Sequence, residues 1–186
     1  MKIKIILFLC IFIIISCQNK NKTNIDIETT IDKNELLEWN KKIVDINTEV
    51  INKFLERRKW KMEISETGLY WQIIKKTNLQ KIVSGKIVEF KFKTFLLSGE
   101  LLYSSEISGN RFLQIDKNQE EVGLNEGLKM LCLGEKARFI IPPHLAFGVA
   151  GDGYKVPVYA VLLYEVEIVE INDANVSKNI FFDDDE

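Results

Sequence analysis

The residues best suited to chemistry gather in one short stretch of the chain, FIIPPHLAFGVAGDGYKVP at residues 139–157. It holds all three prolines of the protein, its only histidine, His144, and three of its ten glycines. Three kinds of segment have this composition: a catalytic histidine loop, a long turn between two strands, and the rim of an apolar site that grips a peptide. The residues elsewhere in the chain decide among them.

A histidine-based catalytic or metal site finds little support. His144 has no second histidine beside it and the chain has no CxxC pair, so the usual ligands of zinc do not cluster. As a general base, His144 would need a nucleophile and an orienting acid, and the spacing supplies neither. The GDG of residues 151–153 lacks the third glycine and the strand–helix context of a dinucleotide loop. We therefore expect no metal, no cofactor and no covalent chemistry, and we interpret His144 as a solvated loop residue.

The start of the chain, MKIKIILFLCIFIIISC, predicts an export signal with a lipid anchor. Two lysines precede an apolar run, Ile5–Ile15, which is too short to span a bilayer as a helix. The order of aliphatic residues, a small residue and a cysteine resembles the bacterial lipobox, where cleavage precedes a lipidated cysteine. We expect removal of residues 1–16 and lipidation of Cys17, with an ordinary secretory signal as the alternative. Gln18, the residue after the cysteine, favours the outer membrane, with the protein facing the periplasm.

The charge and the cysteine content of the chain argue against a nucleic-acid partner and against a disulfide. Removal of the signal removes two of the 25 basic residues, so the mature chain has 23 basic and 27 acidic side chains. A nucleic-acid surface would need a basic excess on one face, so we expect no nucleic-acid partner. Cys132 is the only other cysteine of the mature chain, which excludes an intramolecular disulfide and leaves stability to a hydrophobic core.

Periodicity divides the mature chain into a tether, a helix, a domain and a tail. Residues 17–34 are polar and form the predicted tether. Residues 35–60 predict an amphipathic helix, whose apolar positions are Leu36, Ile43, Ile46, Val50 and Phe54. We expect this face to pack on the domain, with a homodimer through residues 35–60 as the alternative. Residues 172–186 form an acidic tail that we expect to be disordered.

The domain, residues 61–171, combines strand patterns with one short helix. Strands are predicted at residues 68–77, 88–96, 101–105, 136–141 and 160–171. The stretch GLNEGLKMLCL at residues 123–133 places Leu124, Leu128 and Leu131 on one face of a helix. Because the strands do not alternate with helices, we expect an α+β fold with an antiparallel sheet.

Three segments together resemble the FKBP-type peptidyl-prolyl isomerases. They are Gly99 with YSS at 103–105, GLNEGLKMLCLGEKARFIIPPHLAFG at 123–148, and VPVYAVLLYEVEIVEI at 156–171. The pattern of that family, approximately G-[LW]-x-E-[AG]-L, G-E/Q, I-P, L/Y-A-Y-G, I-P and L-x-F-x-V-E-L, matches without gaps from Gly123 to Ile171. The resemblance implies a twisted antiparallel sheet wrapped around the helix that starts at Gly123. It also implies rotation of X–Pro bonds in an apolar site, without nucleophile, metal or cofactor.

The resemblance implies the site residues as well. The apolar catalytic positions are Phe92, Tyr103, Phe147 and Tyr164. The substrate-binding positions are Leu102, Phe112, Glu121, Val122, Leu124 and Val156, with the register of Phe112 open by one residue. Proline-containing proteins are the implied clients, and an FK506-type compound is an implied ligand.

Several of these positions depart from the family. Phe92 and Tyr103 stand where the family has a Tyr and an Asp that bond each other, and losing both leaves no polar group unpaired. Phe147 replaces a Tyr whose hydroxyl bonds the carbonyl of the ligand. Tyr164 replaces Phe, and Glu121 replaces an apolar residue. These departures leave two hypotheses: an isomerase for exported envelope proteins, and a binding or chaperone module with little turnover.

The order of the segments carries a narrower resemblance. A lipoprotein signal, a polar tether, an amphipathic helix, WKMEISETGLYW at residues 60–71 and the domain follow one another as in the gliding-motility-associated isomerase lipoproteins. GDGYKVP at residues 151–157 resembles their form of the rim segment. A role in gliding or secretion is implied by this resemblance alone.

Overall fold

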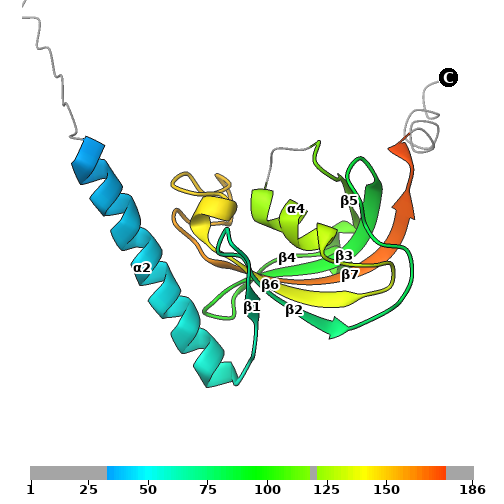
Figure 1. The fold of residues 1–186 in the computed structure, drawn as a ribbon, viewed down its shortest axis with the longest axis horizontal. Helices are drawn as coiled ribbons and strands as arrows, with labels where there is room; N and C mark the ends of the chain where they lie inside the picture. Colours follow the sequence, from blue (N-terminus) through cyan, green and yellow to red (C-terminus); the bar gives the residue numbers. More distant parts are fainter. Residues whose placement is uncertain (1–32, 118–120, 175–186) are drawn as a thin grey trace, which may run out of the picture. The chain divides into compact units, whose positions relative to one another are not determined.

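The computed structural model describes residues 33–117 and 121–174, which include an antiparallel sheet (Figure 1). The predicted signal peptide, Cys17 and the tether up to residue 32 lie outside the described residues, as does the tail from residue 175. The molecule divides into two units after Glu38, and the sheet belongs to the second unit. Within the described residues, no helix has both the length and the apolar character needed to cross a bilayer.

The sheet has seven strands in the order β1-β2-β6-β7-β3-β4, with β5 also paired to β3. The strands are β1 Glu63–Ile64, β2 Tyr70–Lys75, β3 Ile87–Leu96, β4 Leu101–Ser104, β5 Arg111–Gln114, β6 Lys136–Ile141 and β7 Leu162–Asn172. Every pairing is antiparallel, and β3 pairs with β7 along its whole length. The predicted α+β class and the antiparallel sheet are confirmed.

The inner face of the sheet packs against one short helix, α4 Val122–Lys129 (Figure 1). Leu124 and Leu128 of this helix are fully buried among Phe90 and other side chains of β3, β6 and β7. Each such leucine contributes about 1.5–3 kcal/mol by leaving water. Gly127 allows the close approach of α4, because a Cβ atom there would lie 2.8 Å from the ring of Phe139. The predicted helix between the strands is therefore present, although it ends at Lys129.

The outer face of the sheet packs against the last turns of α2 Lys33–Arg58, the predicted amphipathic helix. Ile51 and Phe54 are buried in a second apolar cluster with Tyr70, Ile140, Val161 and Leu163. The predicted apolar face is wrong in part, because Ile46 and Val50 are exposed and Ile51 takes their place. Between Trp39 and Arg58, only the last turns of the helix bury side chains. The apolar residues of the earlier turns are not buried against any of the described residues.

Four short elements were not expected from the sequence. They are β1, β5, α3 Ser105–Ser108 and a single turn of 3₁₀ helix, η1 Pro143–Leu145. Ser104 ends β4 and caps α3, because its hydroxyl accepts the Glu106 N–H at 3.2 Å. Pro142 follows β6 directly and is the N-cap of η1, as expected for a residue that cannot donate to a sheet.

Candidate functional site

Most of the predicted site residues meet on the inner face of the sheet beside α4. Phe92, Leu102, Leu124, Val156 and Tyr164 are buried members of one apolar cluster. Tyr103 and Phe147, half-buried, pack against it. The group comes from β3, β4, α4, β7 and the chain after η1, so the antiparallel pairing brings together segments that lie far apart in the sequence.

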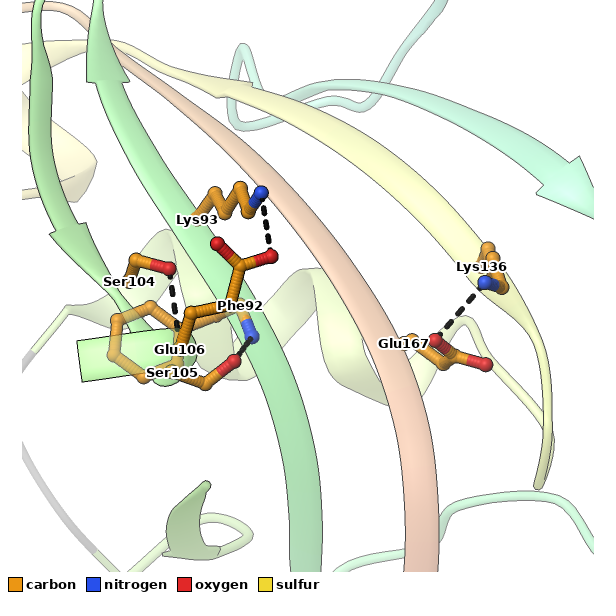
Figure 2. Close-up of polar contacts among 7 residues, drawn as sticks. All are labelled: Phe92, Lys93, Ser104, Ser105, Glu106, Lys136 and Glu167. Carbon is orange, nitrogen blue, oxygen red and sulfur yellow. Dashed lines mark hydrogen bonds and ion pairs between the residues drawn. The ribbon is translucent and has the colours of Figure 1, made fainter. Parts of the chain in front are cut away.

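Phe92 owes its position to a change of strand partner along β3. Upstream, Phe90 pairs with Arg111 of β5; downstream, Lys93 pairs with Ser104 of β4. Between the two ladders the Phe92 N–H donates to the hydroxyl of Ser105 at 3.1 Å (Figure 2). The strand therefore continues without an unsatisfied donor, and the Phe92 ring stays on the inner face, 6.1 Å from the Phe90 ring.

The opposite face of the sheet has a depression of about 300 Å³ across β3, β7 and β6. Its walls are charged: Lys93 lies 2.7 Å from Glu106, and Lys136 lies 3.0 Å from Glu167 (Figure 2). Of the predicted site residues, only Phe92 borders it. A solvated surface of ion pairs contributes little energy and gives no apolar enclosure, so this depression does not fit the chemistry of the inner face.

Glu121, Tyr164 and Arg111 form a polar network within the site. The Tyr164 hydroxyl donates to one carboxylate oxygen of Glu121 at 2.6 Å, and Arg111 Nη1 lies 3.1 Å from the other oxygen. Glu121 is 6 % exposed and adopts a left-handed conformation, φ 52°, directly before α4. Burial and the adjacent Glu121 charge raise the pKa of Tyr164 well above its usual value, so the phenol remains a donor.

The prediction that Phe112 lines the site is wrong. Strand pairing places Phe112 opposite Glu89 and Arg111 opposite Phe90, so Arg111 shares the inner face with Phe90. Phe112 points to the other face and is 45 % exposed. The burial of Leu113 agrees with this placement, because Arg111 and Leu113 lie on the same face of β5. Val122, another predicted contact, is exposed at the start of α4.

Asp152 is a neighbour of the site that was not predicted from the sequence. One of its carboxylate oxygens accepts the backbone N–H groups of Tyr154, Lys155 and Val156 at 2.9, 2.9 and 2.7 Å. The Tyr103 hydroxyl donates to its other oxygen. The only signal was an aspartate followed by turn-forming residues, a pattern in which the side chain bonds nearby backbone N–H groups.

His144 is exposed and takes no part in this group. Its Nε2 lies 3.0 Å from the carbonyl oxygen of Thr67, in the turn before β2. Within the described residues, no group of three or more His, Cys, Asp or Glu side chains is placed to hold a metal ion.

Comparison with known proteins assigns this arrangement to a family. A profile of the FKBP-type peptidyl-prolyl cis-trans isomerases matches residues 79–169. FK506-binding protein 2 of Dictyostelium discoideum is 36% identical over 93 residues, which cover 50% of this chain and 70% of that protein. The chain belongs to the FKBP-type family. The match covers β3 to β6, α4 and most of β7, the elements that form the inner-face site.

Two further similarities concern longer proteins and the fold of the FKBP-type domain. Human peptidyl-prolyl cis-trans isomerase FKBP9 is 36% identical over 88 residues, but these cover 47% of this chain and only 15% of FKBP9. The crystal structure of FkpA from Escherichia coli superposes with a TM-score of 0.62 at 25% identity, covering 75% of this chain and 65% of that one. The chain thus shares one domain, and not the whole architecture, with its FKBP9 relative.

Proposed function

We propose that the FKBP-type domain catalyses the cis–trans isomerisation of X–Pro bonds at the inner-face site. The observation that carries the proposal is the convergence of Phe92, Leu124, Phe147 and Val156 on one apolar cluster in a domain of this family. The relative FKBP9 is named as a peptidyl-prolyl cis-trans isomerase, which supports the proposal.

The chemistry needs only such an apolar surface. Rotation about an X–Pro bond crosses a barrier of ~18–20 kcal/mol, because the twisted amide loses its resonance. A twisted amide has less charge separation than a planar one, so a water-poor apolar site favours it over the planar ground state. Binding the twisted form more tightly than either planar isomer lowers the barrier. Leu124, which is fully buried, then serves as the floor of the site, and Val156 as a wall.

The binding-module alternative draws support from the phenols of the site. Phe147 has no hydroxyl, and the hydroxyls of Tyr103 and Tyr164 already donate to Asp152 and Glu121. None of these three aromatic residues therefore offers a free donor to the carbonyl of a bound peptide. Turnover then depends on backbone N–H groups and on the apolar surface alone, and a site that holds proline with slow turnover is the second candidate.

Exchange NMR of a proline peptide separates the two candidates. Catalytic amounts of the purified protein should bring the cis and trans resonances into exchange, and Phe147→Ala should abolish this effect. The matched control is Phe112→Ala, which removes an aromatic ring from the other face of the sheet. Binding of the peptide without exchange would favour the module. An FK506-type compound should displace the peptide in either case.

For the full chain we also propose a lipid anchor at Cys17 and a place in the cell envelope, at the outer membrane and facing the periplasm. The order of charged, apolar and small residues before Cys17 supports it, as does the polar tether that follows. Exported proline-containing proteins are then the clients. Cys17→Ala should leave the protein outside the detergent phase, and unchanged partitioning would contradict the anchor.

Two finer proposals follow from the arrangement of the segments. The resemblance to gliding-motility-associated lipoproteins supports a role in gliding or secretion, and a deletion strain that spreads normally would contradict it. The second proposal is a homodimer that forms through residues 35–60. The exposed apolar side chains of Val44, Ile46 and Val50 on α2 support it. Light scattering of the purified protein should then give twice the monomer mass, and replacing Ile46 by Glu should halve it.

A further inference from the structure

An irregular loop between η1 and β7, residues 148–157, is called the rim loop here. Its residue Val156 forms one buried wall of the site. Val156 is 5 % exposed, whereas Val149 and Tyr154 of the same loop are 68 % and 82 % exposed. A loop with so little burial has few apolar contacts to order it, and fixing its backbone is entropically unfavourable. Apart from the packing of Val156 itself in the apolar cluster, polar contacts therefore hold the loop in place.

Asp152 provides the first set of these contacts. Its carboxylate accepts three successive backbone N–H groups, including that of Val156 at 2.7 Å. The loop is folded tightly upon itself, since a Cβ atom on Gly151, at φ +67°, would lie 2.2 Å from the carbonyl oxygen of Val156. Hydrogen bonds from N–H groups to an ionised carboxylate are stronger than those between neutral groups. One side chain thus fixes the backbone of the wall residue.

Two contacts between the rim loop and β4 provide the second set. From β4, the Tyr103 hydroxyl donates to the Asp152 oxygen that the backbone leaves free. From the loop, the Lys155 ammonium donates to the carbonyl of Leu102 at 3.2 Å and lies 5.3 Å from the centroid of the Tyr103 ring. Two consecutive residues of β4 therefore bond the loop, Leu102 as an acceptor and Tyr103 as a donor.

We propose that Asp152 is a positioning residue for prolyl isomerisation, which fixes Val156 as a wall while Tyr103 and Lys155 tie the rim loop to β4. This inference rests on the proposed function of the inner-face site. It assigns Tyr103 to holding the loop and not to contacting the substrate. When these contacts are lost, only a fraction of molecules presents a formed wall, and the apparent affinity for substrate falls by that fraction. Substrate at saturation restores the formed state, so kcat is largely retained.

Kinetics of the purified protein test the proposal. Asp152→Ala should raise KM about tenfold and leave kcat within about twofold. Asp152→Asn should show a smaller rise, because its amide oxygen still accepts the backbone N–H groups but its amide nitrogen cannot accept the Tyr103 proton. The control is Glu66→Ala, an exposed loop carboxylate without a hydrogen bond or ion pair among the described residues. An unchanged KM in Asp152→Ala would overturn the proposal. So would a fall in kcat alone, because that is the result of losing folded protein.

Amide hydrogen exchange gives a readout that does not depend on turnover. The N–H groups of Tyr154, Lys155 and Val156 should exchange faster in Asp152→Ala than in the wild type, with Tyr103→Phe between them. If the wild type shows no turnover, the isomerase proposal fails while this comparison still decides the role of Asp152. Unchanged exchange at all three amides would overturn that role whatever the activity.

Discussion

Tyr164 and Glu121 share a hydrogen bond of 2.6 Å inside an otherwise apolar cluster. The two residues approach from β7 and from the segment before α4, and Arg111 of β5 completes the pair with its guanidinium. Tyr164 and Glu121 stand where the family resemblance leads one to expect apolar side chains, and strand register gives Arg111 the place predicted for Phe112. The three polar residues satisfy one another, so they are best understood as one coordinated change within the site.

Tyr164→Phe should destabilise the protein. The substitution leaves a carboxylate oxygen of Glu121 without its donor at a position that is 6 % exposed. An unsatisfied buried acceptor costs about 1–3 kcal/mol. Urea denaturation should show this loss, whereas Tyr154→Phe, at a phenol exposed to solvent, should be neutral. Equal stability of Tyr164→Phe and the wild type would mean that the hydrogen bond contributes nothing.

Replacing both partners tests the coupling within the network. In Tyr164→Phe combined with Glu121→Leu, no buried carboxylate remains, and Arg111, whose side chain is 28% exposed, can turn to water. The double variant should therefore be more stable than Tyr164→Phe alone, by about 1 kcal/mol or more. Additive losses in the same urea experiment would show that the two residues act independently.

Phe147→Tyr should raise the rate of isomerisation. It introduces a hydroxyl at a half-buried position beside the site, where the other phenols are already engaged. A new hydrogen bond of about 0.5–1.5 kcal/mol to the peptide carbonyl corresponds to an increase of roughly twofold to tenfold in kcat/KM. Phe112→Tyr adds the same hydroxyl on the other face and should change nothing. A gain in the control alone, or in neither variant, would contradict the placement of Phe147.

The contact between Tyr103 and Asp152 should persist over a wide pH range. Burial alone would raise the pKa of Asp152, but hydrogen bonds from Tyr103 and from three backbone N–H groups lower it to about 2. Its stabilisation is therefore present above the ordinary pKa of 3.8 and is lost as the pH falls through about 2. Burial, together with the hydrogen bond to Asp152 and its charge, raises the pKa of Tyr103 to about 12. Its contribution is present below the ordinary pKa of 10.0 and is lost as the pH rises through about 12.

Titration followed by NMR measures both ends of this range. The Tyr103 ring and the Asp152 carboxyl should show no transition between about pH 4 and pH 10. Tyr103→Phe should move the Asp152 midpoint upward, because one of its donors is gone. A wild-type Asp152 midpoint near its ordinary value would contradict the contact.

Gly127→Ala should destabilise the domain despite the better helix propensity of alanine. Alanine gains about 1 kcal/mol over glycine within a helix. Its Cβ atom would lie 2.8 Å from the ring of Phe139, which is itself fully buried and cannot move aside freely. Overpacking of a core costs about 1–3 kcal/mol, so the packing effect should exceed the propensity effect. A higher melting temperature for Gly127→Ala would show that α4 has room to move away from β6.

The fold could be predicted where one residue pattern extends over a whole element. Alternation along β3 places Phe92 on the inner face, and the spacing of Leu124 and Leu128 identifies α4. The two-residue β1 and the four-residue β5 are too short to show such a pattern. On α2, the periodicity of apolar residues identified the helix but did not show which of its turns pack against the sheet. The burial of Ile51 was therefore not predicted.

Site residues could be predicted only as accurately as the position of each residue along its strand. A shift of one residue along β5 exchanged Phe112 for Arg111, because neighbouring residues of a strand face opposite sides. The role of Asp152 depends on the path of an irregular loop and on Tyr103, which lies 49 positions away in the sequence. No spacing rule connects two such residues, so only the three-dimensional structure could bring them together.

The protease-coupled assay of a cis-prolyl tetrapeptide tests the central claim most directly. The purified protein should accelerate cis-to-trans conversion in proportion to its concentration. Phe147→Ala should lose this acceleration, and Phe112→Ala should retain it. A wild-type rate equal to that of buffer would contradict prolyl isomerisation at the inner-face site, even if the peptide still bound.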